Sequence, residues 1–171
     1  MGAMEDFSLG SVQVSLSPRE RFEEYLQSKS MRNTQPRRLI VDQVFSQHEH
    51  FDADGLLAHL DREFGNRKDK PSRSTVYRTL TELVEAGLLR KMDLGGREVY
   101  EFDYGYPQHD HLHCTECNQL IEFQSDEIRR IRDAVAREHQ FRVTGHRLIV
   151  SGICDECTRK RRRKKSPLDL I

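Results

Sequence analysis

Four segments in the first half of the chain carry apolar side chains at the spacing of an amphipathic helix. Each has a start or stop signal: the serine cap and proline of Ser17-Pro18, the proline at Pro36, the capping aspartate at Asp52 and the glycine at Gly87. The apolar stripes are Phe22, Tyr25 and Leu26; Leu39, Ile40 and Val44; Leu56, Leu57, Leu60 and Phe64; and Val76, Leu80, Leu83 and Val84. The pattern therefore predicts four helices, of which the fourth begins near Ser74.

Two short strands are predicted after the helices, at Leu88–Met92 and Glu98–Phe102, with Gly95-Gly96 at the turn between them. Short helices followed by a glycine-tipped hairpin have the element order of a winged helix-turn-helix. We therefore predict a flexible arm at residues 1–17 and a winged-helix DNA-binding domain at residues 18–102.

The pattern changes after Phe102, beginning with the hinge-like stretch Tyr104–Pro107. Residues 109–115, 120–123 and 147–153 alternate as strands, and a helix capped by Ser125 presents Ile128, Ile131 and Val135 on one face. The predicted fold class is α+β, with a small second domain at residues 103–158 whose exposed apolar edge suits self-association. Residues 159–171 are predicted to be a basic tail.

Composition and charge support two small domains. The 171 residues are 33% charged and 36% hydrophobic, which is polar for one compact core. The formal net charge of zero is a cancellation, since residues 91–158 carry −5 and residues 159–171 carry +6. These charges suggest cations as partners for the first stretch and phosphates for the second. With no apolar run of membrane-spanning length and no signal-peptide pattern, we expect a cytoplasmic protein without membrane contacts.

Four cysteines form two CxxC pairs, Cys114 with Cys117 and Cys154 with Cys157. Each CxxC turn can present two sulfurs to one ion, so two such turns complete a tetrahedral four-thiolate zinc site. Such a site is structural because no coordination position stays open. A redox-active CxxC would explain one pair only, and four unrelated buried thiols are the remaining alternative.

Three histidines lie within five positions, at His109, His111 and His113. On a strand they share one face, and Asp110 points to the other. Two imidazoles at this spacing can grip a divalent metal, and the carboxylates of Glu101 and Glu122 could join them. A solvated strand edge is the alternative.

From about Arg19 to Cys157 the chain resembles the ferric uptake regulator family of bacterial metal-dependent repressors. The motifs that carry the resemblance are Arg73–Leu80, His109–Cys117, Ile121–Phe123, His146 and Cys154–Cys157. The resemblance implies a homodimer with a regulatory metal held between an N-terminal DNA-binding domain and a C-terminal dimerisation domain. By position, the regulatory ligands are His50, Glu101, His109, His111 and Glu122. Iron(II) is the expected metal, followed by manganese(II), with zinc(II) also compatible with these ligands.

The family resemblance also implies a second metal site, to which Asp110 and His146 correspond. The chain departs from the family there, because Gln108 and Arg129 stand where a histidine and a glutamate are usual. Glu127 or His113 could compensate. A hydrogen-bonded pair of Asp110 and His146 is the alternative.

We expect residues 72–83 to form the DNA-recognition helix, with Ser74, Thr75, Tyr77 and Arg78 near the groove. The alternative is that Tyr77 is half-buried and Arg78 merely solvated. The resemblance adds Arg32, where a basic residue probes an A/T-rich minor groove, and Arg37, where one contacts the DNA backbone. The basic tail could contact phosphates or only aid solubility.

The leading interpretation is an iron(II)-dependent repressor that binds A/T-rich inverted repeats as a homodimer. A peroxide- or manganese-responsive regulator of the same family is the next alternative. From other classes, a metallohydrolase and a zinc-stapled adaptor remain. Five candidate protein ligands would crowd out the water that a catalytic metal needs, so we expect no enzyme activity.

Overall fold

The computed structural model describes residue 9 and residues 12–46, 50–65 and 67–164, and the side chains in this range up to Arg161. The chain divides into two compact units with the boundary between Tyr106 and Pro107, inside the stretch predicted to be a hinge. In the described part of the chain, no helix is long and apolar enough to span a membrane.

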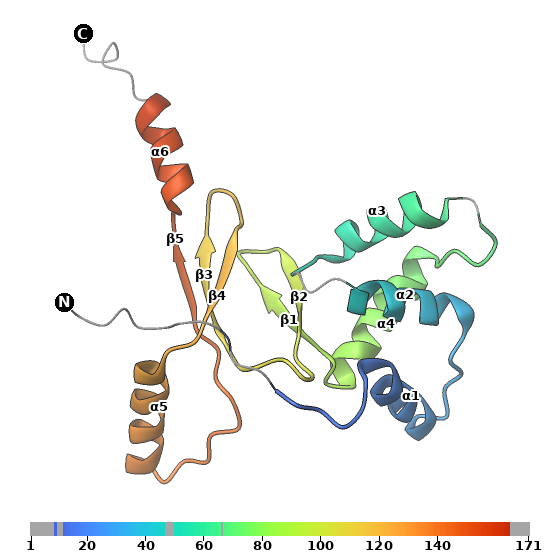
Figure 1. The fold of residues 1–171 in the computed structure, drawn as a ribbon, viewed down its shortest axis with the longest axis horizontal. Helices are drawn as coiled ribbons and strands as arrows, with labels where there is room; N and C mark the ends of the chain where they lie inside the picture. The colour runs from blue at the N-terminus through green and yellow to red at the C-terminus, as the bar shows by residue number, and fades with distance from the viewer. Residues whose placement is uncertain (1–8, 10–11, 47–49, 66, 165–171) are drawn as a thin grey trace. The chain divides into compact units, whose positions relative to one another are not determined.

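The N-terminal unit contains the predicted helices and hairpin (Figure 1). Its elements are α1 (Pro18–Ser28), α2 (Gln35–Ser46), α3 (Ala53–Phe64), α4 (Arg73–Glu85), β1 (Leu89–Asp93) and β2 (Glu98–Phe102). The strands β1 and β2 pair antiparallel. The prediction of a winged helix-turn-helix order is therefore confirmed, with element starts within one residue of those predicted.

Local capping chemistry explains where these helices begin. The Ser17 hydroxyl accepts a hydrogen bond from the Glu20 N–H, and the Glu20 carboxylate accepts one in return from the Ser17 N–H, which makes a capping box. Asp52 caps α3 by accepting from the Gly55 N–H at 2.7 Å. The hairpin turn requires glycine, since Gly95 and Gly96 have φ angles of 69° and 91°.

The helices of this unit pack their apolar stripes into one core. Val76, Leu80 and Leu83 of α4 are fully buried, at 0% exposure. They meet Phe22 and Leu26 of α1 and the buried stripes of α2 and α3. Removing one such side chain from water contributes ~2 kcal/mol, so α4 is held mainly by its apolar face. Its opposite face is left exposed.

A buried ion pair links α2 to α4. The Arg37 guanidinium lies 2.9 Å from a Glu82 carboxylate oxygen, and the two side chains are only 12% and 9% exposed. Arg37 also donates to the backbone carbonyl of Arg32. Because the partners are 45 residues apart, no local pattern in the sequence indicates this pair.

The C-terminal unit is built on a three-stranded sheet in the order β4-β3-β5. Its elements are β3 (Asp110–Cys114), β4 (Leu120–Phe123), α5 (Asp126–Glu138), β5 (Ile149–Gly152) and α6 (Asp155–Lys164). The central strand β3 pairs antiparallel with β4 and parallel with β5. The predicted order of strand, strand, helix and strand is confirmed.

One element differs from the prediction, because α6 continues into the residues predicted to be a basic tail. Two ion pairs spaced four residues apart support it: Asp155 with Arg159 at 2.8 Å and Glu156 with Lys160 at 2.7 Å. Arg161 pairs with Glu116, which lies between β3 and β4. The acidic residues before the basic run therefore favour a helix that composition alone does not indicate.

We expect the substitution Glu82→Ala to lower the free energy of unfolding by about 3 kcal/mol, because it leaves the Arg37 charge buried without its partner. The double substitution Arg37→Met with Glu82→Leu removes both charges and should recover most of this loss. Urea unfolding of the three proteins measures both effects. A loss of less than about 1 kcal/mol in Glu82→Ala would show that the pair behaves as a solvated surface pair.

Candidate metal centres and recognition helix

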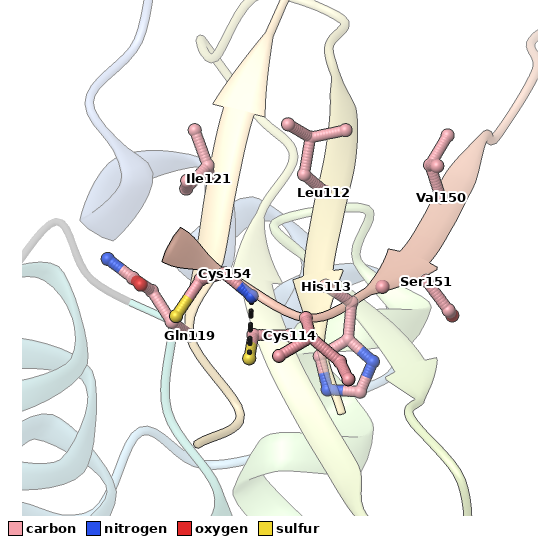
Figure 2. Close-up of a pocket in the computed structure, with 10 residues that line it drawn as sticks. Leu112, His113, Cys114, Gln119, Ile121, Val150, Ser151 and Cys154 are labelled. Atoms are coloured by element: carbon pink, nitrogen blue, oxygen red, sulfur yellow. Dashed lines mark hydrogen bonds between the residues drawn. The ribbon is translucent and has the colours of Figure 1, made fainter. Parts of the chain in front are cut away.

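The pairing of β3 with β5 brings the two CxxC turns together. Cys114, the last residue of β3, is opposite Gly152, the last residue of β5. The Thr115 N–H donates to the Gly152 carbonyl at 2.9 Å. The Cys154 N–H donates to the Cys114 sulfur at 3.3 Å (Figure 2). Both cysteine pairs therefore meet at one end of the sheet.

The four sulfur atoms lie close enough together to bind one zinc ion. The sulfurs of Cys114, Cys117, Cys154 and Cys157 all lie within 4.8 Å of one another. The Cys117 and Cys154 sulfurs are 3.8 Å apart. Tetrahedral zinc with Zn–S bonds of about 2.3 Å places two sulfurs about 3.8 Å apart. The donor set and its geometry therefore fit zinc.

The thiols of this cluster differ in acidity. Hydrogen bonds from backbone N–H groups, above all that of Cys154, lower the pKa of Cys114 to about 6. Burial, followed by hydrogen bonds with the neighbouring cysteines, raises the pKa of Cys157 to about 12. At Cys117 a backbone hydrogen bond lowers the pKa, but hydrogen bonds with neighbouring cysteines, together with burial, outweigh it and raise the pKa overall. At neutral pH these shifts favour the thiolate at Cys114 and the thiol at Cys117 and Cys157, so metal binding displaces protons from the cluster.

The C-terminal unit also positions a group of imidazole and carboxylate donors. His109 Nε2 lies 3.2 Å from His111 Nε2 and 3.6 Å from a Glu122 oxygen. The Nδ1–H of His109 donates to the Pro107 carbonyl at 2.8 Å, which leaves its Nε2 lone pair directed at His111. An ion about 2.1 Å from both nitrogens would separate them by about 3.0 to 3.4 Å, depending on coordination geometry. We call His109, His111 and Glu122 the C-terminal half-site.

The N-terminal unit holds a second pair of donors, His50 and Glu101. The His50 Nε2 lies 3.5 Å from a Glu101 oxygen, and the two side chains are 16% and 4% exposed. Glu101 is on β2, and Arg90 of β1 lies 3.8 Å from its other oxygen. We call His50 and Glu101 the N-terminal half-site.

The alternation of side chains predicted for β3 is observed, but His113 does not join His109 and His111 in the C-terminal half-site. His109, His111 and His113 are all buried, and Leu112 between them is 42% exposed. His113 Nε2 lies 3.4 Å from the Asn118 side-chain oxygen. Strand alternation therefore places all three histidines on the inner face, and His113 has a partner of its own.

Asp110 and His146 form a close pair on the opposite face of β3. His146 Nε2 lies 3.0 Å from an Asp110 oxygen, and the two side chains are 17% and 4% exposed. Gln108 and Arg132 contact the other imidazole nitrogen, each at 2.9 Å. Arg129, at the position where the family usually has a glutamate, pairs instead with Asp126. No sequence pattern indicates that Arg132 belongs to this group.

The exposed face of α4 carries the residues predicted to read DNA. Ser72 caps the helix, and its hydroxyl is 3.0 Å from that of Ser74 and 2.8 Å from that of Thr75. Tyr77 is 37% exposed, and Arg78 is exposed. Arg73 donates to the Tyr77 hydroxyl at 3.1 Å and pairs with Asp54 at 3.0 Å.

The two arginines implied by the family resemblance differ in their surroundings. Arg32 is exposed in the loop before α2. Arg37 makes the buried pair with Glu82, and its guanidinium holds the Arg32 carbonyl. In this structure Arg37 therefore supports the loop that carries Arg32.

Comparisons with known proteins agree on one family. Residues 28–151 match the sequence profile of the Ferric uptake regulator family. The ferric uptake regulation protein of Neisseria gonorrhoeae is 34% identical over 141 residues, which cover 81% of this chain and 94% of that protein.

Solved structures show the same fold. The ferric uptake regulator of Helicobacter pylori superimposes with a TM-score of 0.74 at 22% identity, over 87% of this chain and 97% of that one. A zinc-bound manganese uptake regulator is 34% identical with a TM-score of 0.57, over 78% of this chain and 98% of that one.

We expect zinc binding at the cysteine cluster to weaken as the pH falls, because protons and zinc compete for the same sulfurs. The Cys157 thiol gives up its proton on binding at any moderate pH, and below about pH 6 Cys114 also becomes protonated. Competition with a chromophoric chelator between about pH 5.5 and 8 should therefore give an affinity that falls more steeply at the acid end. A pH-independent affinity would contradict binding by these thiols.

Proposed function

We propose that iron(II) controls DNA binding by this chain, which belongs to the ferric uptake regulator family. The family consists of metal-responsive transcriptional regulators, so the chain is a regulator of this kind and not an enzyme. We further propose that it acts in the cytoplasm as a homodimeric repressor on A/T-rich inverted repeats. The observation that carries the proposal is the presence in each unit of a half-site of imidazole and carboxylate donors.

The two half-sites are proposed to share one regulatory metal ion. His50 and Glu101 supply only two donors, fewer than the three or more protein ligands usual for a bound transition metal. The C-terminal half-site supplies two imidazoles and one carboxylate, a set that suits iron(II) with positions left open. The N-terminal half-site offers the donors that complete such a coordination sphere. The family resemblance assigns all five residues to one site.

This arrangement makes DNA binding depend on metal by a population shift. His50 and Glu101 belong to the unit that reads DNA, whereas His109, His111 and Glu122 belong to the unit proposed to dimerise. When both half-sites bind one ion, they restrict the orientations available to the DNA-reading unit. The fraction of molecules able to engage successive grooves of the DNA then rises. The size of this rise is set by how much more tightly the metal binds the DNA-competent orientation than the other orientations.

The choice of iron(II) rests on ligand type and on availability. Imidazole and carboxylate donors also suit manganese(II) and zinc(II), and intrinsic affinity alone would favour zinc over iron(II). The two relatives named above with 34% identity are called regulators of ferric and of manganese uptake, so similarity does not choose between these metals. A glutamate at Glu122, where peroxide sensors of the family usually have aspartate, favours a metal sensor.

The cysteine cluster is proposed to hold zinc as a structural ion. Four thiolates fill the coordination sphere of zinc and leave no position for a substrate or for a DNA-dependent ligand. The cluster joins β3, β5 and the start of α6. Its role is therefore to stabilise the C-terminal unit.

The exposed face of α4 is proposed to enter the major groove. Ser74 and Thr75 at its N-terminus are placed to contact phosphate together with the backbone N–H groups. Tyr77 and Arg78 are proposed to contact bases or phosphates, and Arg32 an A/T-rich minor groove. Arg37 is proposed to contact the DNA backbone while it stays paired with Glu82.

An exposed apolar face of the C-terminal unit is proposed to form the dimer interface. Leu112 lies opposite Ile121 on one side and Val150 on the other, so the three side chains form a row across the sheet (Figure 2). They are 42%, 45% and 45% exposed. Val135 of α5 and Phe141, just beyond its end, are 51% and 70% exposed. Apolar patches of this kind mark protein interfaces, and a two-fold dimer matches an inverted repeat.

We expect manganese(II), used as an air-stable substitute for iron(II), to tighten binding to an A/T-rich inverted-repeat duplex at least tenfold at fixed salt. The variants His50→Ala and His111→Ala should each lose this tightening, because each removes a donor from a different half-site. Fluorescence anisotropy with a chelator control measures the effect.

The matched controls for this measurement are His59→Ala for the N-terminal unit and His139→Ala for the C-terminal unit. Both remove a histidine outside the half-sites, since the His59 side chain is 34% exposed against 16% for His50 and His139 is exposed, and both should respond to metal like the unsubstituted protein. If His50→Ala keeps the full metal response while His111→Ala loses it, the shared ion is contradicted. If neither variant loses it, the regulatory site is contradicted.

We expect the substitution Leu112→Glu to shift the protein from dimer to monomer, because it places a charge in the middle of the apolar row. Sedimentation equilibrium of the zinc-loaded protein measures the state. Val12→Glu is the matched control, since Val12 is similarly exposed, at 48%, but belongs to the other unit. A dimer that survives Leu112→Glu with unchanged affinity would place the interface elsewhere.

A further inference from the structure

We infer that the Arg132 guanidinium, which also pairs with Asp133 at 2.8 Å, supplies the positive charge beside the His146 ring, and that hydrogen bonds close this corner of the C-terminal unit without a metal ion. Asp110 and His146 have the chemistry of metal ligands; Asp110 begins β3, and His146 lies in the irregular segment before β5. The contacts around them decide between an open site for a metal and a closed polar network.

The hydrogen-bond donors around His146 fix its tautomer. A guanidinium has only N–H donors, so the Nδ1 atom that Arg132 contacts at 2.9 Å must accept. The Gln108 amide nitrogen lies 2.9 Å from the same atom and donates to the His146 carbonyl at 2.9 Å, which fixes the orientation of the amide. His146 therefore carries its proton on Nε2 and donates it to Asp110. Both imidazole nitrogens are in use, and neither presents a lone pair to a metal.

The carboxylate of Asp110 is satisfied in the same way. It accepts from the His146 Nε2–H at 3.0 Å and from the Leu148 backbone N–H at 3.2 Å. Its side chain is 4% exposed. A metal at this carboxylate would have to displace two donors from a buried position and lie close to a guanidinium that is always charged.

The network connects α5, β3 and the irregular segment before β5, and the sheet by itself does not connect α5 to the other two. Arg132 comes from α5, Asp110 from β3, and His146 and Leu148 from the irregular segment before β5. The Leu148 carbonyl accepts from the His111 N–H at 3.0 Å, directly beside the Asp110 contact. The network therefore fixes the start of the β3–β5 register, and with it the strand that carries His109 and His111. Arg132 acts here as a positioning residue.

Metal counting tests this assignment. The expected number of ions per chain rests on the proposed function: one zinc at the cysteines and one ion at the half-sites. A cobalt(II) titration of the zinc-loaded protein should therefore show one further equivalent, which is lost in His111→Ala and kept in His146→Ala. If a further equivalent depends on His146, the inference is overturned. A missing His111-dependent equivalent would instead contradict the regulatory site and leave this inference standing.

A gain-of-site variant tests the role of the guanidinium. The double substitution Gln108→His with Arg132→Ala removes the cation and adds an imidazole beside Asp110 and His146. It should bind one more cobalt(II) than the unsubstituted protein, and adding His146→Ala should abolish the gain. Gln108→His with Arg129→Ala is the matched control, because it removes an arginine one turn away on α5 that pairs with Asp126, and it should show no gain. A gain in the control, or none in the test variant, would overturn the role of Arg132.

The tautomer can be measured without any substitution. Nitrogen NMR of the histidine rings, in protein without an ion at the half-sites, should show that His146 carries its proton on Nε2. Its Nδ1 chemical shift should be displaced from that of an unbonded ring nitrogen by the Arg132 hydrogen bond. The substitution Arg132→Ala should remove that displacement, and Arg129→Ala should not. A proton on Nδ1 in the unsubstituted protein would overturn the inference.

Discussion

Pairing on both edges of β3 is the constraint on which the C-terminal unit depends. A strand held by neighbours on both sides cannot rotate, so its side chains keep alternating faces. One face carries His109 and His111, the other carries Asp110, and Leu112 extends its apolar row across all three strands. The end of the same strand places Cys114 at the thiol cluster. A slip of one residue would move His111 to the face that now carries Leu112, and Leu112 to the face that now carries His111.

Two arginines show how this protein uses internal cations. Arg37 is buried against Glu82 in the N-terminal unit, and Arg132 lies against His146 in the C-terminal unit. Each joins a helix to a segment distant in the sequence, and each guanidinium keeps its charge under all ordinary conditions. The planar guanidinium offers several N–H donors in fixed directions, which gives these junctions a defined geometry that an apolar contact of the same size would not provide.

Much of the fold follows from local chemistry in the sequence. Ser17 and Asp52 mark helix starts, and the φ angles of Gly95 and Gly96 explain the hairpin turn. The cysteine spacing predicts four sulfurs around one point. The partnerships of Arg37 and Arg132 were not predictable, because they join residues many positions apart whose spacing follows no period. The helix through the basic run was missed because its support comes from the preceding acidic residues, Asp155 and Glu156.

The position of Cys157 has a consequence for the last helix of the chain. Cys157 lies in the first turn of α6, and a ten-residue helix is too short to be stable on its own in water. Contacts that fix Cys154 and Cys157 in the thiol cluster therefore help to nucleate α6. The order of this strongly cationic helix is thus thermodynamically linked to the thiol cluster. Oxidation of these thiols would therefore also loosen the first turns of α6, where Arg159 and Lys160 lie, so a chemical change at the cysteines would alter the placement of neighbouring positive charges.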